Sequence, residues 1–155
     1  MRKWLITLST TLIVATLAAP AIAGPKTVHT VEGLLVDTQA GAPSRMWVSN
    51  DILHVRRVPV SDILKADGQV IGQLDRSVNF NWDQGSGAST AWCSYTLELT
   101  NPDLGTLTGH CRGTLLAGTL VGNGPNGHLQ GTYTLEPGGV PSVGPYRLLF
   151  EIQER

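Results

Sequence analysis

The central segment of the chain, residues 92 to 136, carries glycine at short and nearly regular intervals. These glycines lie at positions 105, 109, 113, 118, 122, 124, 127 and 131, between apolar and β-branched residues. Glycine weakens an ordinary strand, so its repeated use indicates tight bends, bulges or close approach of one backbone to another. Such a pattern is typical of strands in a small, curved barrel.

The remaining segments alternate apolar and polar residues in short runs, which is the pattern of half-buried strands. Val78, Phe80 and Trp82 share one face of such a run, and Tyr146 and Phe150 share a face of the last run. Residues 61 to 66 are the one fair helix candidate, and no segment is long enough for a crossover helix. We therefore predict an all-β fold, an antiparallel closed barrel of about eight strands. A two-sheet β-sandwich is the alternative.

Two cysteines, Cys93 and Cys111, fit one particular strand pairing. If the chain turns back at residues 101 to 103, a single register places these cysteines opposite each other and Tyr95 opposite Gly109. The same register sorts apolar side chains to one face and polar ones to the other, as alternation along strands requires. The sequence thus predicts a disulfide between Cys93 and Cys111.

The first 23 residues have the features of a cleaved signal peptide. Arg2 and Lys3 precede an apolar run, and the small residues Ala21 and Ala23 lie just before Gly24. The apolar run is too short and too rich in hydroxyl side chains to span a membrane comfortably. We expect residues 1 to 23 to be removed and residues 24 to 155 to form a single domain. That domain would be exported, periplasmic or secreted, with no membrane insertion after cleavage.

Charge and motifs argue against several classes of function. Without the signal peptide the chain has nine basic and twelve acidic residues, a net charge of −3, which disfavours a nucleic-acid partner. Residues 122 to 127 match G-x-G-x-x-G, but a strand follows them, so we predict a hairpin loop and no dinucleotide. The four histidines lack the spacing of a metal site. We expect no metal, no cofactor and no identifiable catalytic residue.

Two adjacent arginines, Arg56 and Arg57, stand within an apolar strand. Neighbouring side chains in a strand point to opposite faces, so we expect one of them to face the interior of the barrel. An inward charge needs a partner, and Glu32, Asp75 and Glu98 are the acids on adjacent predicted strands. Either this arginine forms a salt bridge at the end of the barrel, or it anchors an acidic ligand in an apolar cavity.

The glycine pattern resembles that of the allene oxide cyclase and dirigent barrels, and more closely that of exported bacterial relatives of this barrel. The resemblance rests on GTLTG at 105–109, Gly118, GNG at 122–124, and Gly127 followed by GTY at 131–133. It covers residues 50 to 136 and implies a barrel that binds or cyclises small apolar molecules without metal or redox cofactor. No catalytic residue of the family matches a position here, so the cyclase activity does not transfer.

Three functions remain as hypotheses. The first is a binding barrel for a small apolar or amphipathic ligand. The second is a structural or protein-interaction module that acts through the loops at residues 83 to 89 and 137 to 145. The third is a cofactor-free cyclase or isomerase, which would need an inward acid or base from among Glu32, Arg56, Arg57 and Glu98. The residues expected to line the cavity of the first hypothesis are Val78, Phe80, Trp82, Tyr95, Leu97, Tyr133 and Phe150, with Arg56 or Arg57 as the polar anchor.

Overall fold

The computed structural model describes residues 26 to 141 and 143 to 155, and the predicted signal peptide lies outside them. Every regular element in these ranges is a strand. They are β1 (Val28–Ala40), β2 (Arg45–Ser49), β3 (Ile52–Ala66), β4 (Gln69–Asp83), β5 (Ser89–Leu99), β6 (Thr106–Gly113), β7 (Ala117–Asn123), β8 (Gly127–Val140) and β9 (Gly144–Glu154). Within these ranges there is no candidate for a membrane-spanning helix.

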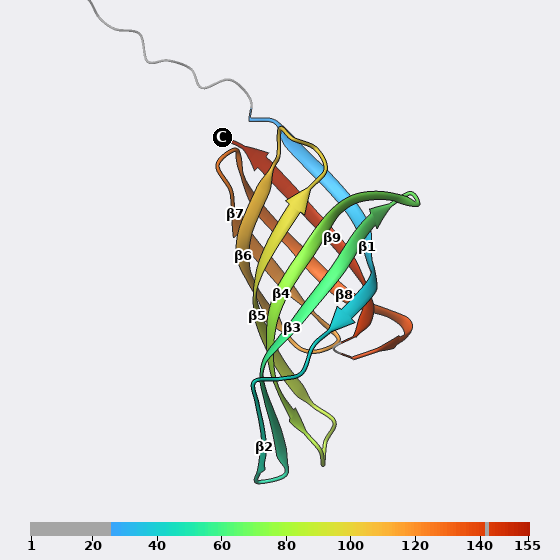
Figure 1. Ribbon diagram of the computed structural model, residues 1–155, viewed down its shortest axis with the longest axis vertical. Coiled ribbons are helices and arrows are strands. Elements are labelled where there is room, and N and C mark those ends of the chain that lie inside the picture. Colours follow the sequence, from blue (N-terminus) through green and yellow to red (C-terminus); the bar gives the residue numbers. More distant parts are fainter. Residues whose placement is uncertain (1–25, 142) are drawn as a thin grey trace, which may run out of the picture.

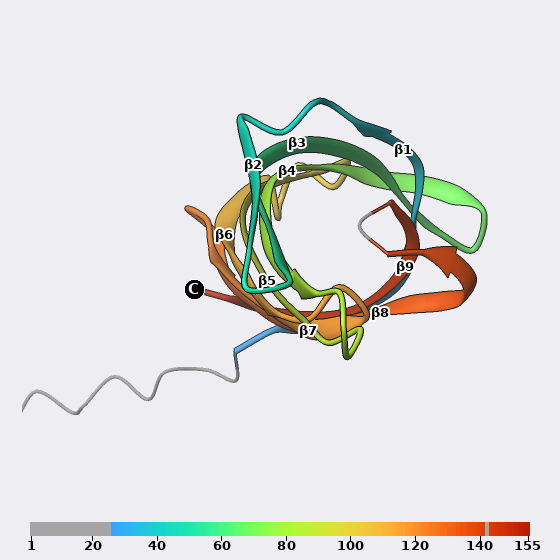
Figure 2. The ribbon, with the colours of Figure 1, turned by 90° about the horizontal axis from the view of Figure 1, so that it is seen from below.

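All nine strands belong to one antiparallel sheet, in the order β1-β9-β8-β7-β6-β5-β4-β3-β2. β1 also pairs with β3, so β1 and β3 to β9 form a closed ring of eight strands. Figure 2 looks along this ring, and Figure 1 shows β2 projecting with β3 beyond one end of it. The predicted all-β, antiparallel arrangement of about eight strands is confirmed, and the alternative of two packed sheets is not what forms.

β5 and β6 pair in the register that the sequence predicts. Cys93 lies opposite Cys111, and Tyr95 lies opposite Gly109. The two cysteines form a disulfide across these neighbouring strands, with Cα atoms 4.9 Å apart and Cys93 buried inside the ring. A structural disulfide is compatible with an exported protein.

Several of the recurrent glycines make room for tyrosine rings that lie against the inner surface of the sheet. A Cβ atom on Gly122 would come within 2.5 Å of the Tyr95 Oη, and one on Gly109 within 2.7 Å of it. A Cβ atom on Gly118 would come within 2.5 Å of the Tyr133 Oη. Close approach, one of the reasons that the sequence suggests, therefore explains the glycine at these positions.

Two local predictions are wrong. Residues 61 to 66, the helix candidate, lie inside β3, where β1 pairs on one side and β4 on the other. Hydrogen bonding to two neighbouring strands overrides a weak local preference for helix. Residues 137 to 145, predicted as a loop, are largely strand, because β8 continues to Val140 and β9 begins at Gly144.

Candidate functional site

Side chains fill the inside of the ring. Of the residues predicted to line a ligand cavity, Val78, Tyr95, Leu97, Tyr133 and Phe150 belong to this core, each no more than 7% exposed. A cavity beside Val78 and Tyr133 has a volume of about 30 Å³. Since one water needs about 10–15 Å³ of such space, this cavity could hold only a few water molecules. These five residues therefore pack the core and do not surround a ligand-sized space together.

The remaining two, Phe80 and Trp82, line a pocket at one end of the ring. Its volume is about 470 Å³, within the range of roughly 300–1,000 Å³ that is typical of small-molecule sites. Apart from a glycine and a serine its lining is apolar. The lining residues are Leu53, Phe80, Trp82, Gly87, Ser89, Leu115, Leu116, Val140 and Pro141.

The end of β4 brings the two aromatic residues to this pocket. Strand alternation keeps Phe80 and Trp82 on the inner face of β4, and β4 runs past the mouth of the ring, at the lower end of Figure 1. Because the mouth has no neighbours further out, Trp82 is 42% exposed although it points to the same face as the buried Val78. The prediction that Val78, Phe80 and Trp82 share one face is confirmed. That face is exposed to solvent only towards Trp82, at the mouth of the ring.

The turn between β6 and β7 forms a fixed wall of the pocket. The backbone N–H of Leu115 donates to Ser89 Oγ at 3.0 Å, and the Tyr146 hydroxyl donates to the Leu115 carbonyl at 2.8 Å. Leu115 is buried, whereas Leu116 beside it is 56% exposed and Val140 across the pocket is 58% exposed. Exposed apolar side chains on a hydrogen-bonded frame are what a preformed apolar site requires.

Among the residues that the structure describes, the charged side chains inside the ring are Asp62 and Arg76, neither of which the sequence reasoning singled out. Arg76 Nη2 lies 2.6 Å from Asp62 Oδ2, and Thr38 Oγ1 donates to Asp62 Oδ1 at 2.6 Å. The Arg76 guanidinium also lies over the ring of Tyr146, 5.6 Å from its centroid. The signal for both was strand alternation. Asp62 shares its face with Val60 and Leu64, and Arg76 shares its face with Leu74 and Val78, so both side chains point inward with these apolar residues. The predicted helix at residues 61 to 66 obscured this alternation for Asp62, which lies within it.

The expectation that Arg56 or Arg57 faces the interior is wrong. The pairing of β3 with β4 shifts register between Val55 and Val58, which inserts a bulge at the two arginines. Arg57 takes a positive φ of 53°, and its backbone N–H donates to Asn79 Oδ1 at 3.0 Å. Because a bulge re-aims side chains, both arginines lie on the outer face and neither enters the end pocket.

The groups nominated for catalysis do not face an internal space either. Glu32 pairs with Arg147 on the outer surface, and Glu98 lies exposed on the outer face of β5, as the predicted register requires. Inside the ring, burial raises the pKa of Tyr95, and burial, followed by the charge of Tyr146, raises the pKa of Tyr133 to about 12. Both phenols are therefore neutral near pH 7, and the small cavity beside Tyr133 has no room for a substrate.

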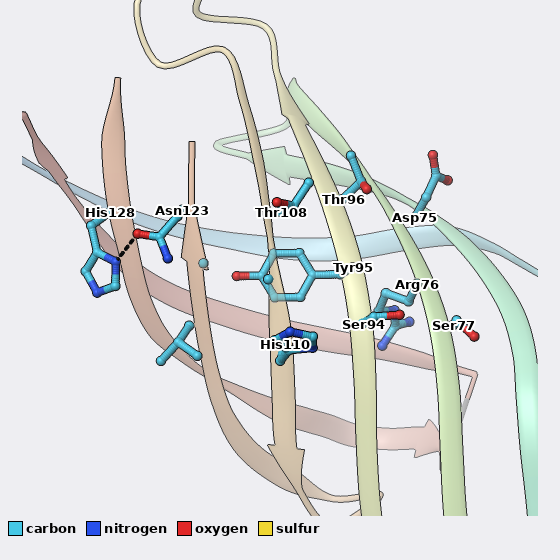
Figure 3. Close-up of a pocket in the computed structure, with 13 residues that line it drawn as sticks. Asp75, Arg76, Ser77, Ser94, Tyr95, Thr96, Thr108, His110, Asn123 and His128 are labelled. Carbon is cyan, nitrogen blue, oxygen red and sulfur yellow. Dashed lines mark hydrogen bonds between the residues drawn. The ribbon is translucent and has the colours of Figure 1, made fainter. Parts of the chain in front are cut away.

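A larger hollow of about 710 Å³ lies over the outer face of β4 to β8, and Figure 3 shows the side chains around it. Asp75, Ser94, His110 and His128 are among them, each from a different strand. Ser94 and His110 are cross-strand partners, yet among the described residues His110 makes no hydrogen bond to Ser94. A serine nucleophile is activated by a base that is hydrogen-bonded to it, and this pair does not make that contact.

Within the described ranges, no group of three or more His, Cys, Asp or Glu side chains is placed to hold a metal ion. No family model, curated protein or solved structure matches the chain. The end pocket is thus the arrangement with the clearest chemical character, an apolar site of ligand size.

Proposed function

We propose that this is an exported binding protein that holds a small apolar or amphipathic molecule in the pocket at the end of the ring. The observation that carries the proposal is the 470 Å³ apolar pocket, open at the mouth where Trp82, Leu116 and Val140 are exposed. The disulfide supports export. The resemblance to allene oxide cyclase and dirigent barrels stays a prediction that points to the same class of ligand.

The size of the pocket limits the affinity. A drug-sized ligand gains about 0.3 kcal/mol per non-hydrogen atom, so a molecule of about 20 such atoms would gain about 6 kcal/mol. That free energy corresponds to a Kd of tens of micromolar at 25 °C. A natural ligand that fits better, or that places a polar group at the exposed rim, would bind more tightly.

Titration with Nile red, a neutral apolar dye, tests the proposal. We expect its emission to rise on binding, and Leu116→Glu to weaken binding at least about tenfold, because a carboxylate at the rim must be desolvated. Val70→Glu is the matched control. The exposed fraction of Val70, 52%, is similar to that of Leu116. Val70 lies near the β3–β4 turn and is not one of the pocket residues. The control should bind as the unmodified protein does.

Native mass spectrometry of protein purified from its own host supplies the second readout. A small molecule retained under native conditions and lost on denaturation would give the ligand's mass. Absence of dye binding, or equal loss of dye binding in both variants, would overturn the proposal.

The filled interior favours a second candidate, a protein-interaction module. Its contact surface would be the same mouth of the ring, formed by the β4–β5 loop, the β6–β7 turn and the β8–β9 turn. Asp83 fixes the first of these loops, since its Oδ1 accepts hydrogen bonds from the backbone N–H groups of Gly85 and Ser86. A protein captured by the unmodified chain but not by Leu116→Glu, with no dye bound, would select this candidate.

A further inference from the structure

Alternating arginine and tryptophan side chains lie across the outer face of β2, β3 and β5. The Arg45 guanidinium lies 4.6 Å from the centre of the Trp47 ring. Arg56 lies between two indoles, 5.0 Å from the Trp47 ring and 4.8 Å from the Trp92 ring. Cation–π contacts of this length are favourable. We refer to Arg45, Trp47, Arg56 and Trp92 as the arginine–tryptophan ladder.

Hydrogen bonds hold the centre of the ladder in place. Arg56 donates from Nη1 to the carbonyls of Val55 and Phe80, and from Nη2 to Asn81 Oδ1. These bonds use three of the five N–H donors of the Arg56 guanidinium group, so two donors remain for another partner. His54, stacked on Trp47 at 4.7 Å, hydrogen-bonds through Nδ1 to the same Asn81 oxygen.

Two more arginines extend the ladder at its sides. Arg112 on β6 lies directly opposite Trp92, and Arg57 is turned outward by the bulge in β3. Among the described residues none of these four arginines has a carboxylate within 4.0 Å, unlike Arg76 and Arg147. Between Arg56 on β3 and Trp92 on β5, the outward-facing residues of β4 are Asn79 and Asn81, which are uncharged. A protein with net negative charge thus keeps a local cluster of unneutralised guanidinium groups.

We propose that the arginine–tryptophan ladder, with Arg57 and Arg112, binds an anionic polysaccharide that carries carboxylate or sulfate groups. Guanidinium forks bind such oxyanions in a bidentate manner. β2 and β6 are separated by four strand spacings, so the arginines span about 19 Å across the sheet. This surface suits an extended chain with repeated anionic groups better than a single small anion.

The occupied aromatic faces argue against single-stranded nucleic acid. Base stacking needs an open ring face. Here Trp47 is covered by Arg45, Arg56 and His54, and Arg56 also lies over Trp92. Each ladder tryptophan thus carries a guanidinium group on a ring face, and the free N–H edges of these groups recognise charge. The site is separate from the end pocket, so it does not depend on the function proposed for that pocket.

Calorimetric titration of the folded, disulfide-bonded protein with heparin and with polygalacturonate tests the proposal, with neutral dextran as the uncharged comparison. We expect binding to at least one of the two polyanions, weakened by added salt as screening requires. The double variant Arg45→Gln/Arg112→Gln should lower the affinity about tenfold or more, since two charge-assisted contacts are lost. Tighter binding of heparin would indicate sulfate as the group recognised, and tighter binding of polygalacturonate would indicate carboxylate.

The matched control is Lys26→Gln/Arg155→Gln, which removes two positive charges outside the ladder and should leave the affinity within about twofold. Both altered arginines of the test variant are exposed, so both variants should give the far-ultraviolet circular dichroism spectrum of the unmodified protein, which reports the strands and not the surroundings of Trp47. Equal weakening in the two double variants, binding of dextran, or no binding to either polyanion would overturn the proposal. Equally tight binding of single-stranded DNA or polyglutamate would also overturn it, in favour of another class of partner.

Discussion

The contact between Tyr95 and Gly122 allows a quantitative test of why glycine recurs in this sheet. A Cβ atom on Gly122 would lie 2.5 Å from the Tyr95 Oη and 3.3 Å from its Cζ, while the nearest backbone atom, the Thr108 carbonyl oxygen, lies at 3.2 Å. The tyrosine hydroxyl is therefore the main obstacle. It is buried, and among the described residues it has no hydrogen-bond partner.

Gly122→Ala should destabilise the protein by about 1–2 kcal/mol. Overpacking a core typically costs about 1–3 kcal/mol. Replacing glycine in a strand returns about 0.5–1 kcal/mol, because alanine loses less conformational freedom on folding. For a domain of this size the melting temperature should fall by about 4 °C per kcal/mol.

Tyr95→Phe provides the partner for a double-mutant cycle. Removing an unsatisfied buried hydroxyl should be neutral or stabilise by up to about 1 kcal/mol. In the Tyr95→Phe background, Gly122→Ala should then cost close to nothing, which makes the coupling energy about 1–2 kcal/mol. Urea unfolding of the four proteins, followed by tryptophan fluorescence, measures it. The reasoning is refuted if Gly122→Ala is neutral in the unmodified protein, or equally costly in both backgrounds.

Three further outcomes follow from the core. Asp62→Asn should destabilise the protein by about 3–5 kcal/mol in urea unfolding, because Arg76 keeps a buried charge, whereas the apolar pair Asp62→Leu/Arg76→Met should recover most of that loss. Replacing Cys93 and Cys111 by alanine should cost about 3 kcal/mol by the loop-closure argument, and a loss below about 1 kcal/mol would contradict it. Burial raises the pKa of Tyr133 to about 12, above its ordinary value of 10.0, so its contribution to stability is complete below pH 10 and lost as the pH rises through 12. Unfolding free energy that stays constant between pH 10 and pH 12 would exclude this linkage.

Much of the second half of the molecule follows from the sequence because its strands obey strict alternation. The register of β5 with β6 places Cys93 against Cys111 and simultaneously separates polar from apolar side chains, so only one pairing satisfies both. The inward face of β9, with Tyr146, Leu148 and Phe150, follows in the same way. Period-two patterns are reliable where one face is buried and the other is solvated.

The first half departs from that rule at β3. Its bulge at Arg57 changes which residues face inward, and a bulge depends on how β4 pairs with β3 and on the Asn79 side chain that holds the Arg57 N–H. The local sequence of β3 does not reveal which strand will pair with it or in which register. The β3–β4 pairing also brings Asp62 close to Arg76, and the separate pairing of β2 with β3 places Arg45 opposite Arg56.

The candidate sites likewise contain features that the sequence predicts and features that only the folded structure shows. The sequence by itself determined an all-β antiparallel fold, one disulfide and the apolar character of Phe80 and Trp82, because alternation and cysteine pairing are local or nearly local properties. Only the tertiary structure decided that the ring is filled and that the apolar pocket lies at its mouth. It also decided that the arginines gather on the outer face, because side-chain volume, strand register and bulges depend on which strands become neighbours.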